Sequence, residues 1–77
     1  MDDIATNLKQ QILTQKLQLW KGTLYDAGLD AKVATVVDNA QLQAASEKRV
    51  KEALQAIELI EGLIEKLEIE NKEKDDA

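Results

Sequence analysis

The chain has 77 residues, 44% of them hydrophobic and 32% charged, with a formal net charge of −5 at pH 7. This length allows one domain, near the lower limit at which a single core holds a chain together. Cysteine and histidine are both absent, which excludes disulfides and thiolate metal sites and removes the commonest general base and zinc ligand. The acidic balance disfavours a phosphate backbone as a partner.

The apolar residues are almost entirely aliphatic. The chain has one Trp, one Tyr and no Phe, so its core must come from Leu, Ile, Val and Ala. Such side chains suit helix packing. There is no proline, and the three glycines are too few for the turns of an all-β domain. The predicted fold class is therefore all-α.

The first half of the sequence has the apolar spacing of a helix over about residues 3–37. Asp2 and Asp3 favour the N-terminus of this helix. Two apolar stripes run along it at helical spacing. The first stripe comprises Leu13, Leu17, Trp20, Leu24 and Ala27. The second comprises Ile4, Leu8, Ile12, Leu19, Leu29, Val33, Val36 and Val37. A helix with two apolar faces needs two neighbours.

Gly28 allows two interpretations. It could end the first helix as a left-handed C-cap, with Asp30 capping a short second helix, which gives a three-helix arrangement. Alternatively, the helix continues through Gly28 at a cost of about 1 kcal/mol, and the chain turns at about residues 38–40. Helical phase favours the second interpretation, because Ala31 and Ala34 extend the first stripe only if the helix is unbroken.

The second half predicts a helix over about residues 41–70. Its core seam has heptad spacing and comprises Val50, Ala53, Ile57, Ile60, Ile64 and Leu67, with Leu63 widening it. Folding the chain at the turn places residues whose numbers add to about 77 opposite one another, and this pairs the seam with the first stripe. We therefore predict one domain over residues 1–70, an antiparallel hairpin of two long helices. We expect residues 71–77 to form a disordered acidic tail.

Candidate catalytic and metal-binding residues are few. Glu58, Glu61 and Glu65 offer oxygen ligands, but they flank an apolar seam at spacings typical of a solvated helix face. Helical di-metal sites usually add histidine, which the chain lacks. Two helices also supply no desolvated pocket that could shift a carboxylate pKa. We predict no enzyme, no metal site and no cofactor.

Lys48, Arg49 and Lys51 form the one basic cluster in the sequence. They are the candidate phosphate contacts of an alternative function, a small nucleic-acid-binding regulator. Glu47 and Glu52 bracket the cluster, and no aromatic residues interleave to stack on bases. Nucleic acid is therefore not the expected partner.

The second stripe is the candidate interaction surface. A single antiparallel helix cannot cover its eight aliphatic residues, and an exposed strip of that size exceeds what monomers usually carry. Association of two hairpins into a four-helix bundle would bury it. The predicted function is a self-associating adaptor, chaperone subunit or assembly factor, with itself and an unidentified protein as partners. No secretory signal or membrane-spanning run is apparent, so we expect a cytoplasmic protein without a membrane partner.

Overall fold

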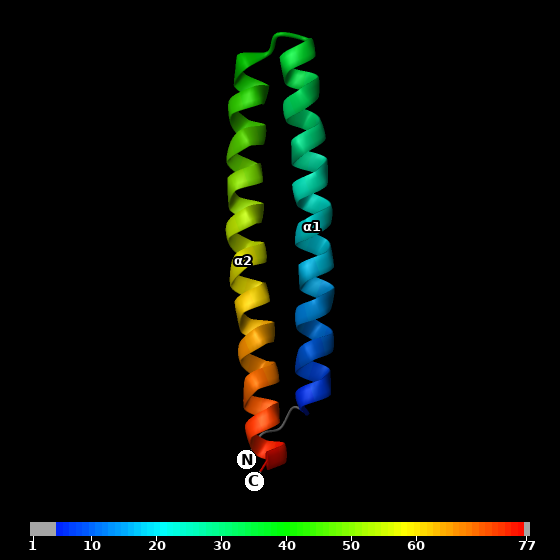
Figure 1. Ribbon diagram of the computed structural model, residues 1–77. Helices are drawn as coiled ribbons and strands as arrows, with labels where there is room; N and C mark the ends of the chain where they lie inside the picture. The colour runs from blue at the N-terminus through cyan, green and yellow to red at the C-terminus, as the bar shows by residue number, and fades with distance from the viewer. Residues whose placement is uncertain (1–4, 77) are drawn as a thin grey trace.

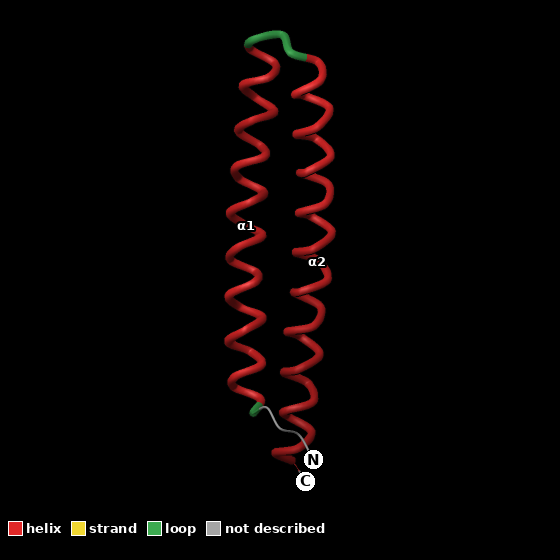
Figure 2. Tube along the Cα trace, turned by 180° about the vertical axis from the view of Figure 1, so that it is seen from behind, coloured by secondary structure: helices red, strands yellow, loops and turns green. Residues whose placement is uncertain are grey.

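The computed structural model describes residues 5–76, and the side chains of residues 5–72. Helix α1 spans Thr6–Val36 and helix α2 spans Ala40–Asp76. The two helices run antiparallel and side by side, joined by a short loop at one end (Figures 1 and 2). Residues 5–76 contain no strand. The predicted all-α helical hairpin is confirmed, and its loop, residues 37–39, lies within one residue of the predicted turn.

Helix α1 continues through Gly28 without a break, so the three-helix alternative is wrong. A Cβ built on Gly28 would meet no atom within 4 Å, so this glycine is not required by a close helix approach. The unbroken helix keeps both apolar stripes in phase, and this consistency outweighs the modest helix propensity lost at one glycine.

The chain reverses through a Schellman motif centred on Asp38, whose φ of 57° is left-handed. The backbone N–H of Asn39 donates to Ala34 O at 2.9 Å, and that of Asp38 donates to Thr35 O at 3.3 Å, the bond pair of this motif. The side chain of Asn39 then caps α2, because its Oδ1 accepts the N–H of Leu42 at 3.0 Å. The left-handed cap lies here, ten residues beyond Gly28.

The interface between the helices buries mostly small side chains. The buried residues recur at intervals of seven in each helix: Ala27 and Ala34 in α1, and Ser46, Ala53 and Ile60 in α2. The larger residues of the first stripe and of the seam are only half-buried: Leu13, Leu17, Trp20, Leu24, Val50, Ile57, Ile64 and Leu67. One neighbouring helix therefore encloses the narrow centre of the seam but not its edges.

The C-terminal end of the fold differs from the prediction. The sequence predicts the second helix to end near residue 70 and a disordered tail over 71–77, whereas α2 continues as helix to Asp76. Glu and Lys, which dominate residues 70–74, are good helix formers even without a packed face. The i,i+4 spacing of Glu68 and Lys72 adds support. Residues 1–4, which include Asp2, Asp3 and the predicted start of the first helix, lie outside the described residues.

Ser46 provides a test of the seam. It is 1% exposed, and its Oγ has no hydrogen-bond partner within the described part of the chain. Ser46→Ala should therefore raise the free energy of unfolding by about 1 kcal/mol, because it removes a buried, unsatisfied hydroxyl. Urea unfolding followed by circular dichroism at fixed protein concentration measures the change.

The matched control is Ala53→Ser, one heptad further along α2 and 0% exposed. It introduces the same hydroxyl into the same seam and should destabilise by about 1 kcal/mol. Destabilisation by Ser46→Ala would contradict the structure, because it would show that the Ser46 hydroxyl makes a hydrogen bond.

Candidate self-association surface

The second stripe of α1 is uncovered along its described length. Its residues are between 39% and 84% exposed. They are Leu8, Ile12, Leu19, Leu29, Val33, Val36 and Val37. Ile4, the eighth predicted member, lies outside the described residues. Helix α2 therefore packs mainly on the first stripe and leaves most of the second exposed.

The structure divides this stripe into two rows. Ile12, Leu19 and Val33 fall at intervals of seven or fourteen residues, on one flank of the hairpin. Leu8, Leu29 and Val36 fall on a second row, further around the back of α1. The rows therefore do not form one flat surface.

Helix α2 contributes exposed apolar residues to the same flank as Ile12. Ile12 and Leu13 line a shallow groove with Leu63 and Leu67 of α2. Leu42 lies on the same heptad row as Leu63. We call this flank the apolar face: Ile12, Leu19, Val33 and Val37 of α1 with Leu42, Leu59 and Leu63 of α2, each 36% exposed or more.

The opposite flank of the hairpin is mainly polar. A shallow hollow there is lined by Tyr25, Gly28 and Lys32 of α1 and by Val50 of α2, with Leu29 reaching its edge. Its large exposed apolar side chains are Tyr25 and Leu54, at 71% and 51%. The remaining heptad positions on the α2 side of this flank are mostly glutamates: Glu47, Glu58, Glu61, Glu65 and Glu68. The hairpin is therefore strongly one-sided.

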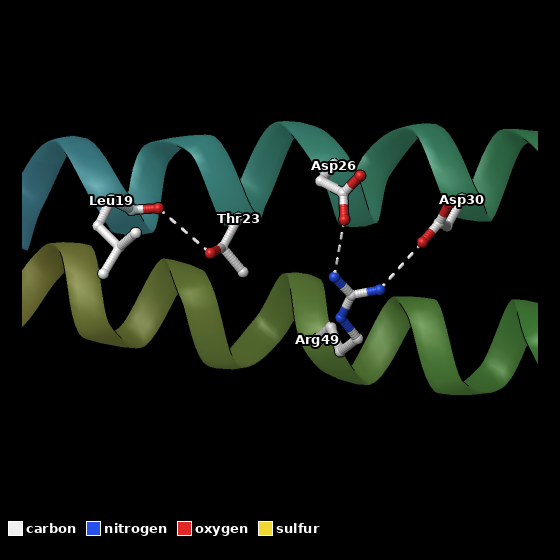
Figure 3. Close-up of polar contacts among 5 residues, drawn as sticks. All are labelled: Leu19, Thr23, Asp26, Asp30 and Arg49. Carbon is white, nitrogen blue, oxygen red and sulfur yellow. Dashed lines mark hydrogen bonds and ion pairs between the residues drawn. The ribbon is translucent and has the colours of Figure 1, made fainter.

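A polar cluster crosses the apolar face between the helices (Figure 3). Arg49 of α2 donates from Nη1 to Asp30 Oδ2 and from Nη2 to Asp26 Oδ2, both at 3.0 Å. The hydrogen bonds to Asp26 and to Asp30 raise the pKa of Arg49 above its usual value. Arg49 therefore stays charged throughout the pH range in which proteins fold.

This cluster reports the register of the hairpin. Arg49 lies between Asp26 and Asp30 and is thus centred on residue 28. Since 28 and 49 add to 77, the helices pair in the predicted register. The cluster is not among the features predicted from the sequence, although the predicted register places Arg49 between these two carboxylates.

The candidate phosphate contacts do not form one site. Arg49 is directed at Asp26 and Asp30 of α1. Lys48 and Lys51 are exposed and share a separate surface hollow with Ala44 and Glu47. The alternative nucleic-acid function is left with two of its three cations, beside an acidic side chain.

Residues 5–76 also bear on two further kinds of site. Among these residues, no group of three or more carboxylates is arranged to hold a metal ion, and Glu58, Glu61 and Glu65 are exposed. Neither helix contains, in that same part of the chain, an apolar stretch long enough to cross a membrane. Comparison of the chain with protein-family models, with curated proteins and with solved structures finds no match. Function is therefore inferred from the chain's own residues and geometry.

We expect the Arg49 cluster to stabilise the contact between the two helices through its charge. Arg49→Gln removes both interhelical hydrogen bonds and should lower the melting temperature by a few degrees at low salt. The difference from the wild type should shrink as salt is added, because exposed ion pairs are screened. Thermal melts at two salt concentrations measure it.

The control is Lys48→Gln, which removes the same charge from a neighbouring exposed position of α2. It should leave the melting temperature nearly unchanged. An equal loss in both variants would mean that the bonds of Arg49 to α1 do not stabilise the hairpin.

Proposed function

We propose that this protein is a non-enzymatic interaction module, a hairpin that self-associates through its exposed apolar side chains and serves as an adaptor, chaperone subunit or assembly factor. The observation that carries the proposal is the surface that the single hairpin leaves uncovered. Its accessible area is 6123 Å², whereas a compact monomer of 8.6 kDa exposes about 4,700 Å².

The excess area reflects an open shape. The hairpin measures 59 × 16 × 16 Å, with a radius of gyration of 17.4 Å, against about 11.5 Å for a compact chain of this length. The excess of about 1,400 Å² is larger than the roughly 800 Å² that each partner buries in a standard stable interface. One standard interface would therefore bury more than half of this excess area.

The chemistry of this surface supports association with protein rather than catalysis or phosphate binding. Seven large aliphatic residues gather on the apolar face, and burying a Leu, Ile or Val side chain stabilises by about 1.5–3 kcal/mol. A second hairpin laid on this face would complete a four-helix bundle, in which each helix gains the second neighbour that it lacks. No observation favours the nucleic-acid alternative, since Arg49 is held by Asp26 and Asp30.

Self-association is tested by charge insertion on the apolar face. The double variant Ile12→Glu/Leu19→Glu should convert dimer to monomer and lower stability with it, because the buried interface and the fold support one another. Sedimentation equilibrium gives the mass, and circular dichroism melts give the stability. The same change at Leu17 or Ile60, in the seam between the helices, should unfold the chain outright.

The matched control is Tyr25→Glu/Leu54→Glu, which places two carboxylates on the opposite flank at similarly exposed positions. It should remain dimeric. A wild type that stays monomeric at high micromolar concentration, while helical and cooperative on melting, would refute the proposed function.

A further inference from the structure

Charge is distributed unevenly along the apolar face. Toward the open end of the hairpin, the face is bordered by three cations and one carboxylate: Lys9, Lys16, Lys66 and Glu70. Toward the loop, it is bordered by three carboxylates and one cation: Asp26, Asp30, Glu52 and Arg49. The open half therefore carries a net charge of +2 and the loop half a net charge of −2.

The apolar residues follow the same division. Ile12, Leu19, Leu59 and Leu63 lie on the open half of the face, and the smaller Val33 and Val37 lie with Leu42 on the loop half. Thr23 and Ala56 lie between the halves, on the heptad rows of Asp30 and Arg49. The Thr23 hydroxyl is satisfied by a 3.2 Å bond to Leu19 O. The middle of the face thus consists of short side chains that allow close approach of another backbone.

These patterns distinguish the two ways in which identical hairpins can meet. A parallel pair would place the +2 half on the +2 half and the −2 half on the −2 half. An antiparallel pair, related by a two-fold axis through the middle of the face, places opposite charges together. It also brings Ile12 of one copy to the level of Val33 of the other, so that larger and smaller side chains alternate.

We propose, building on the proposed function, that the occupant of the apolar face is a second copy of this chain docked antiparallel, with the two-fold axis near Thr23 and Ala56. Lys16 then faces the Asp26 and Asp30 cluster of the second copy. The Arg49 cluster then has two roles: it connects the two helices of one hairpin, and it orients the other hairpin.

Orientation is measured with spin labels, for which the absence of native cysteine gives a clean background. Gln41→Cys places a label near the loop, on an exposed position of α2. Gln41 lies fifteen residues from Ala56, so in the antiparallel dimer the two labels should be about 45 Å apart along the long axis. In a parallel dimer they should be separated by a few helix widths, on the scale of the 16 Å short axes.

The control label is Gln55→Cys, two heptads further along the same exposed row of α2. It lies at the level of the proposed axis, so its inter-label distance should be short. Short distances from both labels would overturn the antiparallel arrangement but leave the proposed function standing. A monomer by sedimentation, with no distance between labels, would overturn both.

The choice of face is tested by charge reversal. Lys16→Glu should weaken dimerisation about tenfold, because it opposes the carboxylates of the second copy. Lys21→Glu, one heptad before Gly28 on the opposite flank, should leave dimerisation unchanged. The reverse result, with Lys21→Glu weakening the dimer and Lys16→Glu without effect, would assign the interface to the opposite flank and overturn the inference.

Discussion

Each helix of a two-helix hairpin has only one neighbouring helix against which to bury its apolar side chains. Contact with a single helix encloses the centre of the seam, where Ala27, Ala34, Ser46 and Ala53 leave almost no exposed area. Larger residues on either side of that line keep an exposed edge. The core of the hairpin is thus incomplete, and seven of the thirteen large hydrophobic side chains exposed among the described residues lie on the apolar face. Burial rather than helix propensity is the quantity that a second hairpin would supply.

The Arg49 cluster is polar, yet it lies on the flank that we propose to be an interface. Exposed ion pairs contribute little to stability on their own. The effect of the cluster on the arrangement of the helices is therefore more important than its energy. Arg49 fixes the two helices at one register through Asp26 and Asp30. In an antiparallel dimer it would also prevent the apolar rows from sliding along one another, since a shift would separate the carboxylates from the partner's Lys16. Interfaces commonly use charge for register and apolar area for affinity.

Helical phase made most of the fold predictable. Two apolar stripes that stay in phase across Gly28 require one continuous helix. The predicted register, in which opposed residues add to about 77, agrees with the bonds of Arg49 to Asp26 and Asp30. Features that helical phase does not determine were harder to predict. The contribution of Leu59 and Leu63 to the exposed face depends on how α1 covers α2, and the helical end of α2 depends on propensity without packing. The division of the second stripe into two rows depends on the position of each residue relative to α2, which the spacing within α1 does not give by itself.

Small-angle X-ray scattering can show whether two hairpins lie side by side to complete one core. Forward scattering gives the mass of the assembly, and the distance distribution gives its longest dimension. We expect twice the 8.6 kDa chain mass with a longest dimension still close to 59 Å, because the second copy adds thickness and not length. A particle of single-chain mass, or a dimer about twice as long as one hairpin, would contradict it.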